Sequence, residues 1–199
     1  MCLIVFAWRP DHAQPLIVAA NRDEFYARPS LPLAQWPEAP HVHAGRDLEA
    51  GGSWLGIGAN GRFAALTNIR DPHQPPARKS RGELVAGFLT GDQSLEDYLA
   101  DVVDRSPDYA GFNLLLGNHH ELWHFNARMS EPVMLESGVY GLSNAGLDTP
   151  WPKLLKAKAA LSVVLEDPTP ARLLELLGDA QTAPFAELPD TGVGLATES

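Results

Sequence analysis

The sequence predicts an α+β fold, in which helices pack against β-sheets. Short apolar runs fill its first third, two amphipathic helical stretches follow, and further strands then lead to two helices that begin with proline. This order of strands, helices, strands and helices fits a four-layer αββα sandwich, although pattern alone does not distinguish it from a two-layer α+β fold. The 199 residues suit one domain over residues 1–199.

Strands are predicted for the first part of the chain. Residues 2–8 and 16–20 are short apolar runs whose flanking prolines favour strands over helix fragments. Residues 53–58 and 62–67 flank the dipeptide Asn60-Gly61. Because a type I′ turn needs two consecutive residues with positive φ, this dipeptide predicts a β-hairpin.

The rest of the chain is predicted to mix helices and strands. Ser94 is the expected N-cap of a helix, with Asp97 at the third helical position. The tail from Ala183 has no clear period. In chain order we expect a loop at 71–81, helices at 82–89 and 94–104, hairpin strands at 112–116 and 121–125, strands at 133–135 and 139–143, and helices at 150–165 and 170–177.

Composition narrows the classes of partner and compartment. The net charge of −10 argues against a nucleic acid or an anionic membrane as a binding partner, since binding to either requires a basic face on the protein. The first apolar run has no basic flank and the second is shorter, so neither is a signal peptide or a membrane span. One cysteine allows no internal disulfide. We therefore expect cytoplasmic residence and a small-molecule ligand, with the oligomeric state left open.

The single cysteine, Cys2, directly follows Met1. When Met1 is trimmed, as usually happens before a small residue, Cys2 carries both a thiol and a free α-amine. An α-amine titrates near pH 7.7–8.0, so it serves as a general base near neutral pH without a histidine. N-terminal-nucleophile enzymes use this pairing. The alternative is that Cys2 is an inert, buried, small hydrophobe.

Polar side chains follow the ends of three predicted strands. The first cluster is Asn21-Arg22-Asp23-Glu24, in which Arg22 is suited to hold a substrate carboxylate or stabilise the Cys2 thiolate. Asp23 is suited to orient the α-ammonium group. The alternative for this cluster is a surface pair formed by Arg22 and Asp23.

Two asparagines stand in the other clusters, Thr67-Asn68-Ile69-Arg70 and Ser143-Asn144. The amide of Asn68 is a neutral donor of the kind found in oxyanion holes. The alternative for Asn68 and for Asn144 is an ordinary turn asparagine.

No metal or cofactor is predicted. The histidine groups are His41 with His43, and His119 and His120 with His124, and Glu121 is their only close acidic neighbour. Surface histidines are therefore the preferred interpretation. The sequence also contains no glycine-rich phosphate-binding loop.

Blocks of sequence from residue 1 to about 155 resemble, in order, the NRDE family, also called the transport-and-Golgi-organisation family. The match begins with Met1-Cys2. The later blocks are Ala19-Ala20-Asn21-Arg22-Asp23-Glu24-Phe25, Arg28-Pro29, Gly51-Gly52-Ser53-Trp54-Leu55-Gly56, Gly61-Arg62-Phe63, Leu66-Thr67-Asn68-Ile69-Arg70, Gly141-Leu142-Ser143-Asn144 and Pro150-Trp151-Pro152-Lys153.

The resemblance implies the αββα fold of N-terminal-nucleophile hydrolases, related to cysteine enzymes that cleave bile-acid or penicillin amides. It implies that Cys2 is the nucleophile, that Asn68 is the oxyanion-hole asparagine and that Asn144 is a second asparagine lining the site. Arg22 and Asp23 fall near the arginine and aspartate that follow the second strand of those acylases. The family continues into strands with a Tyr-Gly-Thr-Arg motif, whereas this sequence ends at Ser199. Either the sequence is truncated or this member lacks those strands.

Three functions follow as hypotheses. The first is an N-terminal-cysteine hydrolase that cleaves a non-peptide C–N (amide) bond through a thioester acyl-enzyme. The alternative is a non-catalytic carrier of haem, lipid or acyl-coenzyme A, compounds to which members of the family are linked. A haem would take its axial ligand from Cys2, His119, His120 or His124. The third is an α+β domain with a structural cysteine.

Overall fold

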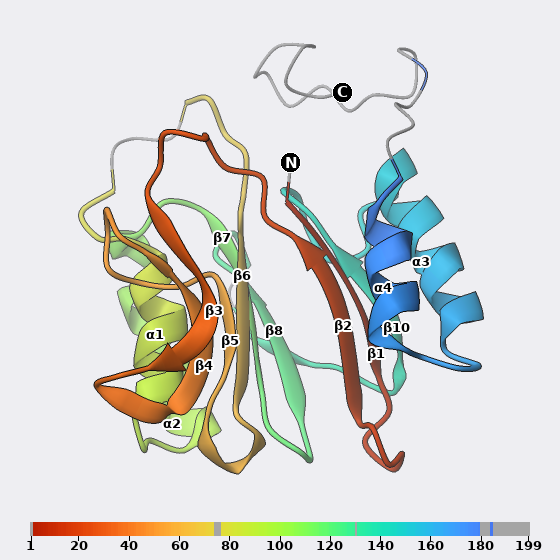
Figure 1. Cartoon of the computed structure of the whole chain (residues 1–199). Helices are drawn as coiled ribbons and strands as arrows, with labels where there is room; N and C mark the ends of the chain where they lie inside the picture. The colour runs from red at the N-terminus through yellow and green to blue at the C-terminus, as the bar shows by residue number, and fades with distance from the viewer. Residues whose placement is uncertain (1, 74–76, 130, 180–183, 185–199) are drawn as a thin grey trace. The chain divides into compact units, whose positions relative to one another are not determined.

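A computed structural model of the chain describes residues 2–73, 77–129, 131–179 and 184. The chain divides into two compact units. The first takes its residues from Met1–Asp23, Ile69–His73 and Glu136–Ser199, and the second from Glu24–Asn68 and Gln74–Leu135. Each unit combines one antiparallel sheet with helices (Figure 1).

The first unit contains a three-stranded sheet in the order β10-β1-β2, with both pairings antiparallel. Alternate residues of its central strand, Leu3, Val5 and Ala7, pack with Trp151, Leu154, Ala157 and Leu161. The two helices α3 and α4 thus cover one face of this sheet (Figure 1). Its elements are β1 (Leu3–Trp8), β2 (Leu16–Asn21), β10 (Gly138–Leu142), α3 (Pro152–Val164) and α4 (Pro170–Leu177).

The second unit contains a seven-stranded antiparallel sheet in the order β3-β4-β5-β6-β7-β8-β9. Its strands are β3 (Ser30–Trp36), β4 (Ala39–Asp47), β5 (Leu55–Ile57), β6 (Phe63–Asn68), β7 (Phe112–Gly117), β8 (Leu122–Asn126) and β9 (Val133–Met134). The remaining elements are the helices α1 (Gly82–Thr90) and α2 (Leu95–Arg105) and the short 3₁₀ helices Ala59–Gly61 and Ser106–Asp108.

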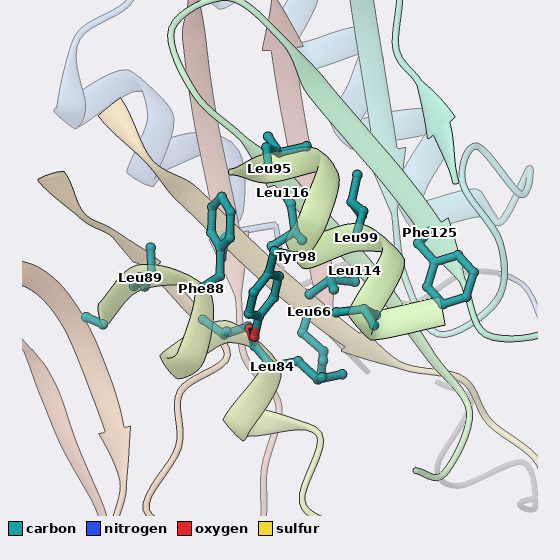
Figure 2. Packing of buried hydrophobic residues seen from close by; sticks show 14 of the residues in the cluster. Leu66, Leu84, Phe88, Leu89, Leu95, Tyr98, Leu99, Leu114, Leu116 and Phe125 are labelled. Atoms are coloured by element: carbon teal, nitrogen blue, oxygen red, sulfur yellow. Dashed lines mark hydrogen bonds between the residues drawn. The ribbon is translucent and has the colours of Figure 1, made fainter. Parts of the chain in front are cut away.

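The core of the second unit lies between α1, α2 and one face of the seven-stranded sheet. Phe88 of α1 and Tyr98 of α2 lie against one another with ring centroids 5.3 Å apart, and the Tyr98 hydroxyl donates to the carbonyl oxygen of Leu84. Figure 2 shows these rings with Leu114 and Leu116, which project from β7 into the same cluster. Apolar residues at helical spacing on α1 and α2 therefore meet alternate residues of the strands.

The predicted hairpin between β5 and β6 is confirmed. Asn60 and Gly61 adopt φ angles of 55° and 72°, the positive values that the dipeptide predicts. The predicted N-cap of α2 is also confirmed, since the Ser94 hydroxyl accepts from the backbone N–H of Asp97 at 3.1 Å. The helix predicted over 150–165 begins two residues later, at Pro152, because Trp151 is the N-cap.

The sequence does not predict the strands β3 and β4. Four prolines punctuate residues 29–40, and such a density usually indicates loops. β3 lies at the edge of the sheet, where a proline interrupts no hydrogen bonds between two flanking strands. Its register with β4 shifts between Leu31 and Ala34, around Pro32. An edge position with a bulge therefore accommodates this sequence.

Gly52 permits a close approach between a loop and the start of α1. A Cβ atom on Gly52 would lie 2.4 Å from the carbonyl carbon of Gly82, and the Ser53 N–H donates to the Gly82 oxygen at 3.1 Å. We expect Gly52→Ala to lower the free energy of unfolding by about 3 kcal/mol, because only backbone movement relieves the overlap. Gly51→Ala is the matched control, since Gly51 has open space but a φ of +77°. Urea unfolding should give this control the smaller loss, about 1 kcal/mol, and an equal loss would contradict the packing argument.

No helix among the described residues combines the length and apolar character needed to cross a lipid bilayer.

Candidate active site around Cys2

Cys2 lies immediately before β1, the central strand of the three-stranded sheet. Both neighbouring strands run antiparallel to β1, so they end where β1 begins: Leu3 pairs with Asn21 and Ile4 pairs with Leu142. The residues that follow β2 and β10 therefore lie at the same end of this sheet as Cys2.

Three segments contact Cys2 directly. Its Sγ lies 4.0 Å from the backbone oxygen of Asp23, the limit for a weak thiol hydrogen bond. Its carbonyl oxygen accepts from the Ser143 hydroxyl at 2.7 Å and from Lys153 Nζ at 3.3 Å. Cys2 itself is half-buried. The residue is thus anchored through its carbonyl while its thiol remains partly accessible.

Asn144 follows Ser143 at this end of the sheet and is 6% exposed. Its carbonyl oxygen accepts from the backbone N–H of Arg70 at 3.0 Å. Arg70 belongs to the segment Ile69–His73, which is part of the same unit. The unit therefore brings three separate stretches of sequence to the end of the sheet where Cys2 lies.

Arg22 and Asp23 directly follow β2, with Arg22 half-buried and Asp23 exposed. The first residue of their cluster has a structural role. Asn21 Nδ2 donates at 3.2 Å to the carbonyl oxygen of Leu177, the last residue of α4. The cluster therefore combines a helix cap with charged residues that follow β2 at the end of the sheet where Cys2 lies.

Asn68 is the last residue of β6 in the second unit, where it is exposed and pairs with Phe112. Of the predicted site residues, the first unit thus holds Cys2, Arg22, Asp23 and Asn144, and the second unit holds Asn68. The chain continues from Asn68 directly into Ile69 of the first unit.

A buried polar network joins three strands of the second unit. Asn113 of β7 donates from Nδ2 to the Thr67 hydroxyl at 3.1 Å, and its Oδ1 accepts from Asn126 Nδ2 at 2.9 Å. His124 Nε2 lies 3.2 Å from the same Oδ1. Because an amide oxygen only accepts, Nε2 carries the proton of a neutral ring. Burial lowers the pKa of His124 to about 4.

The expectation of surface histidines is confirmed for four of the five residues. His41, His43, His119 and His120 are exposed. His124 corrects the expectation, since it is only 4% exposed and bonded within the sheet, a poor position for a haem ligand. Across the part of the chain that the structure describes, no three His, Cys, Asp or Glu residues come close enough to hold a metal ion.

The burial of His124 makes stability depend on pH. The unfolded state takes up a proton near pH 6.5 and the folded state only near pH 4. The free energy of unfolding should therefore fall as the pH drops through this window, by up to about 3 kcal/mol. We expect His124→Gln, whose amide can replace the Nε2 donor, to lose this contribution in urea unfolding at pH 7 and pH 4.5. His41→Gln, on the surface, should match the wild type, and an unchanged pH dependence in His124→Gln would contradict the argument.

Comparison with known families agrees with the sequence resemblance. The model of the Transport and Golgi organisation 2 family matches residues 1–198. The chain belongs to this family. The mouse Transport and Golgi organization 2 homolog is 38% identical over 213 residues, covering 97% of this chain and 76% of the relative. Transport and Golgi organization protein 2 of Drosophila melanogaster is 30% identical over 229 residues, covering 99% and 81%.

Solved structures show the fold of this Transport and Golgi organisation 2 member. The Caenorhabditis elegans ortholog of N-acylethanolamine-hydrolyzing acid amidase matches with a TM-score of 0.58 at 10% identity, covering 90% of this chain and 86% of that one. Penicillin V acylase from Agrobacterium tumefaciens matches with a TM-score of 0.50 at 11% identity, covering 92% and 75%. The predicted α+β fold of the N-terminal-nucleophile hydrolase type is therefore confirmed.

Two residues of the family-like blocks support the second unit of the chain. Arg28 Nη2 lies 2.7 Å from Asp47 Oδ2, which ties the loop after β2 to the end of β4. Arg62 lies over the Phe88 ring at 3.9 Å and donates to the backbone oxygens of Phe88 and Gln93. These arginines stabilise the fold of the family member.

The contacts of Ser143 and Lys153 with the Cys2 carbonyl are not predicted from the sequence. Lys153 ends the family-like block Pro150-Trp151-Pro152-Lys153, and the resemblance implies no role for it. Its position in the first turn of α3 brings Nζ to the Cys2 carbonyl. The positive end of the helix dipole disfavours a cation in the first turn of a helix. A lysine at this position therefore indicates a role other than helix stabilisation.

Proposed function

We propose that this protein is an N-terminal-cysteine hydrolase that cleaves a non-peptide C–N (amide) bond through a thioester acyl-enzyme. The observation that carries the proposal is the place of Cys2 immediately before the central strand β1, with Arg22, Asp23 and Asn144 at the same end of the sheet. Removal of Met1 would give this thiol its own α-amine as a general base.

The proposed reaction has two halves. The α-amine of Cys2 takes the thiol proton, the thiolate attacks the amide carbonyl, and the oxyanion binds the Asn68 amide and a backbone N–H. The α-ammonium then gives its proton to the leaving amine. In the second half, the α-amine takes a proton from water and the resulting hydroxide attacks the thioester. The C–S bond breaks, the carboxylic acid leaves, and the α-ammonium returns its proton to the thiolate.

The charged residues after β2 have supporting roles in this proposal. Asp23 orients the α-ammonium group by a charge-assisted hydrogen bond, and Arg22 holds an anionic group of the substrate. Asn144 lines the site beside Ser143. The single cysteine agrees with a reducing, cytoplasmic setting for such a thiol.

The structural neighbours support this reaction class. One is described as hydrolysing N-acylethanolamines and the other as an acylase of penicillin V, and both substrates contain a non-peptide amide. Since their identities to this chain are 10% and 11%, their likeness supports the scaffold, while the reaction rests on the residues around Cys2.

Amine release from N-acylethanolamines and penicillin V tests the proposal. Purified protein is incubated with each compound, and the amine and acid products are quantified by mass spectrometry. We expect release that is lost in Cys2→Ala, whose folding is checked by thermal unfolding. Release that persists in Cys2→Ala would overturn the proposal. Saturable binding of haemin or an acyl-coenzyme A, with no release from any amide, would favour the carrier hypothesis instead.

A further inference from the structure

The carbonyl group of Cys2 is held by side chains. β1 begins at Leu3, and the strand pairings at this end start with Leu3 and Ile4, so the Cys2 carbonyl lies outside the ladder. Ser143, which is 1% exposed, donates to it at 2.7 Å, and Lys153 Nζ donates to it at 3.3 Å. One donor follows β10 and the other comes from the first turn of α3.

These donors control where the reactive groups of Cys2 point. Leu3 is fixed by the sheet, so the remaining freedom of Cys2 begins with rotation of the peptide plane between the two residues. Fixing the carbonyl oxygen fixes this plane and with it the Cα atom, from which both the thiol and the α-amine project. A residue that becomes an N-terminus has no preceding peptide to hold it, so this clamp matters most after Met1 is removed.

Lys153 also brings a positive charge to the residue that bears the thiol. A neighbouring cation favours the thiolate, which is the nucleophilic form of cysteine. The neighbouring lysines of α3 have other partners: Lys156 pairs with Asp179, and Lys158 with Asp148 at 2.7 Å. Lys153 therefore differs from both of them in contacting Cys2.

We propose that Lys153 is a positioning residue for the nucleophile: with Ser143 it holds the Cys2 carbonyl, and it keeps a positive charge 3.3 Å from that carbonyl oxygen, on the residue that bears the thiol. The catalytic role of Lys153 rests on the proposed function. Its effect on the reactivity of the Cys2 thiol does not depend on that function and can be tested separately. The sequence alone does not indicate this contact, because Lys153 lies 151 positions after Cys2 in the chain.

Alkylation of Cys2 by iodoacetamide tests the inference cleanly, because the chain has one cysteine and each mass increment reports that residue. We expect Lys153→Met to lower the second-order alkylation rate at pH 7 by about tenfold. Lys153→Arg should restore the rate to within about twofold, since it keeps the donor and the charge. Lys156→Met, the same substitution one turn along α3, should react like the wild type.

The outcomes separate this inference from the proposed function. Equal alkylation rates in the wild type and Lys153→Met, or a Lys153→Arg variant as slow as Lys153→Met, would overturn the positioning role. Thermal unfolding checks that each variant is folded. If Lys153→Met folds poorly, Lys153→Gln keeps an N–H donor without the charge and should show a reduced rate. Wild-type protein that hydrolyses no amide, while Lys153→Met still alkylates slowly, would contradict the hydrolase and support the clamp.

Discussion

Inserting one alanine between Met1 and Cys2 should abolish amide hydrolysis while leaving the thiol present. After Met1 is removed, the free α-amine would lie on the inserted alanine, and the nitrogen of Cys2 would be part of a peptide bond. A peptide nitrogen does not accept a proton near neutral pH, so the general base is lost. We expect the steady-state hydrolysis rate to fall by about 10³-fold.

Two measurements make this result specific. Iodoacetamide should still alkylate the inserted variant, which shows that the thiol remains available, whereas Cys2→Ala should take up no label because the chain has no other cysteine. Cys2→Ser keeps the α-amine with a weaker nucleophile and should retain a trace of activity. Hydrolysis by the inserted variant at the wild-type rate would show that the α-amine is not the base.

Replacing Asn68 should produce the second large effect. If its amide binds the oxyanion, Asn68→Ala removes a hydrogen bond that is strongest in the transition state. Loss of one such donor typically lowers kcat by about 10²–10³-fold. Asn68 is exposed at the end of β6, and thermal unfolding checks that the truncated variant is folded. Steady-state kinetics on the best amide substrate provide the measurement.

Asn118→Ala is the matched control for this substitution. Asn118 lies in the turn between β7 and β8, where its Oδ1 accepts from the backbone N–H of His120 at 2.7 Å. Its loss should cost some stability but leave kcat unchanged. A reduction in kcat of less than about threefold for Asn68→Ala would remove Asn68 from the proposed oxyanion hole.

Local signals explain what the sequence could predict of the fold. The positive φ angles of Asn60 and Gly61 and the N-cap at Ser94 depend on neighbouring residues, and both follow from residue type. The strand β3 depends instead on its place at the edge of a seven-stranded sheet. Pairing with β4 determines this edge position, and the local sequence around Pro32 does not indicate it.

The surroundings of Cys2 depend on pairings between distant segments. The resemblance indicated Cys2, Arg22, Asp23 and Asn144 as site residues, but β1 must pair with both β2 and β10 before these residues share one end of a sheet. The contact with Lys153 further requires α3 to pack on that sheet. Such packing has no signature in the spacing of residues along the chain.

His124 differs from the surface residue that its sequence neighbours predict. Its neighbours His119 and His120 lie in a turn, and the cluster of three predicts surface histidines. In β8, however, Leu122, His124 and Asn126 share one side of the strand, and all three are buried. The period of two along a strand places His124 on the same side as Leu122, but burial of that side and the polar partners of His124 depend on the tertiary structure.

The intact mass of the purified protein, before and after exposure to a small thiol-reactive acylating probe, tests the central claim most directly. The account predicts a chain that lacks Met1 and gains one acyl group on Cys2 faster than free cysteine does. That acyl group should then hydrolyse away and restore the starting mass. A chain that retains Met1, or a Cys2 that reacts no faster than free cysteine or keeps its acyl group, would contradict a working N-terminal nucleophile.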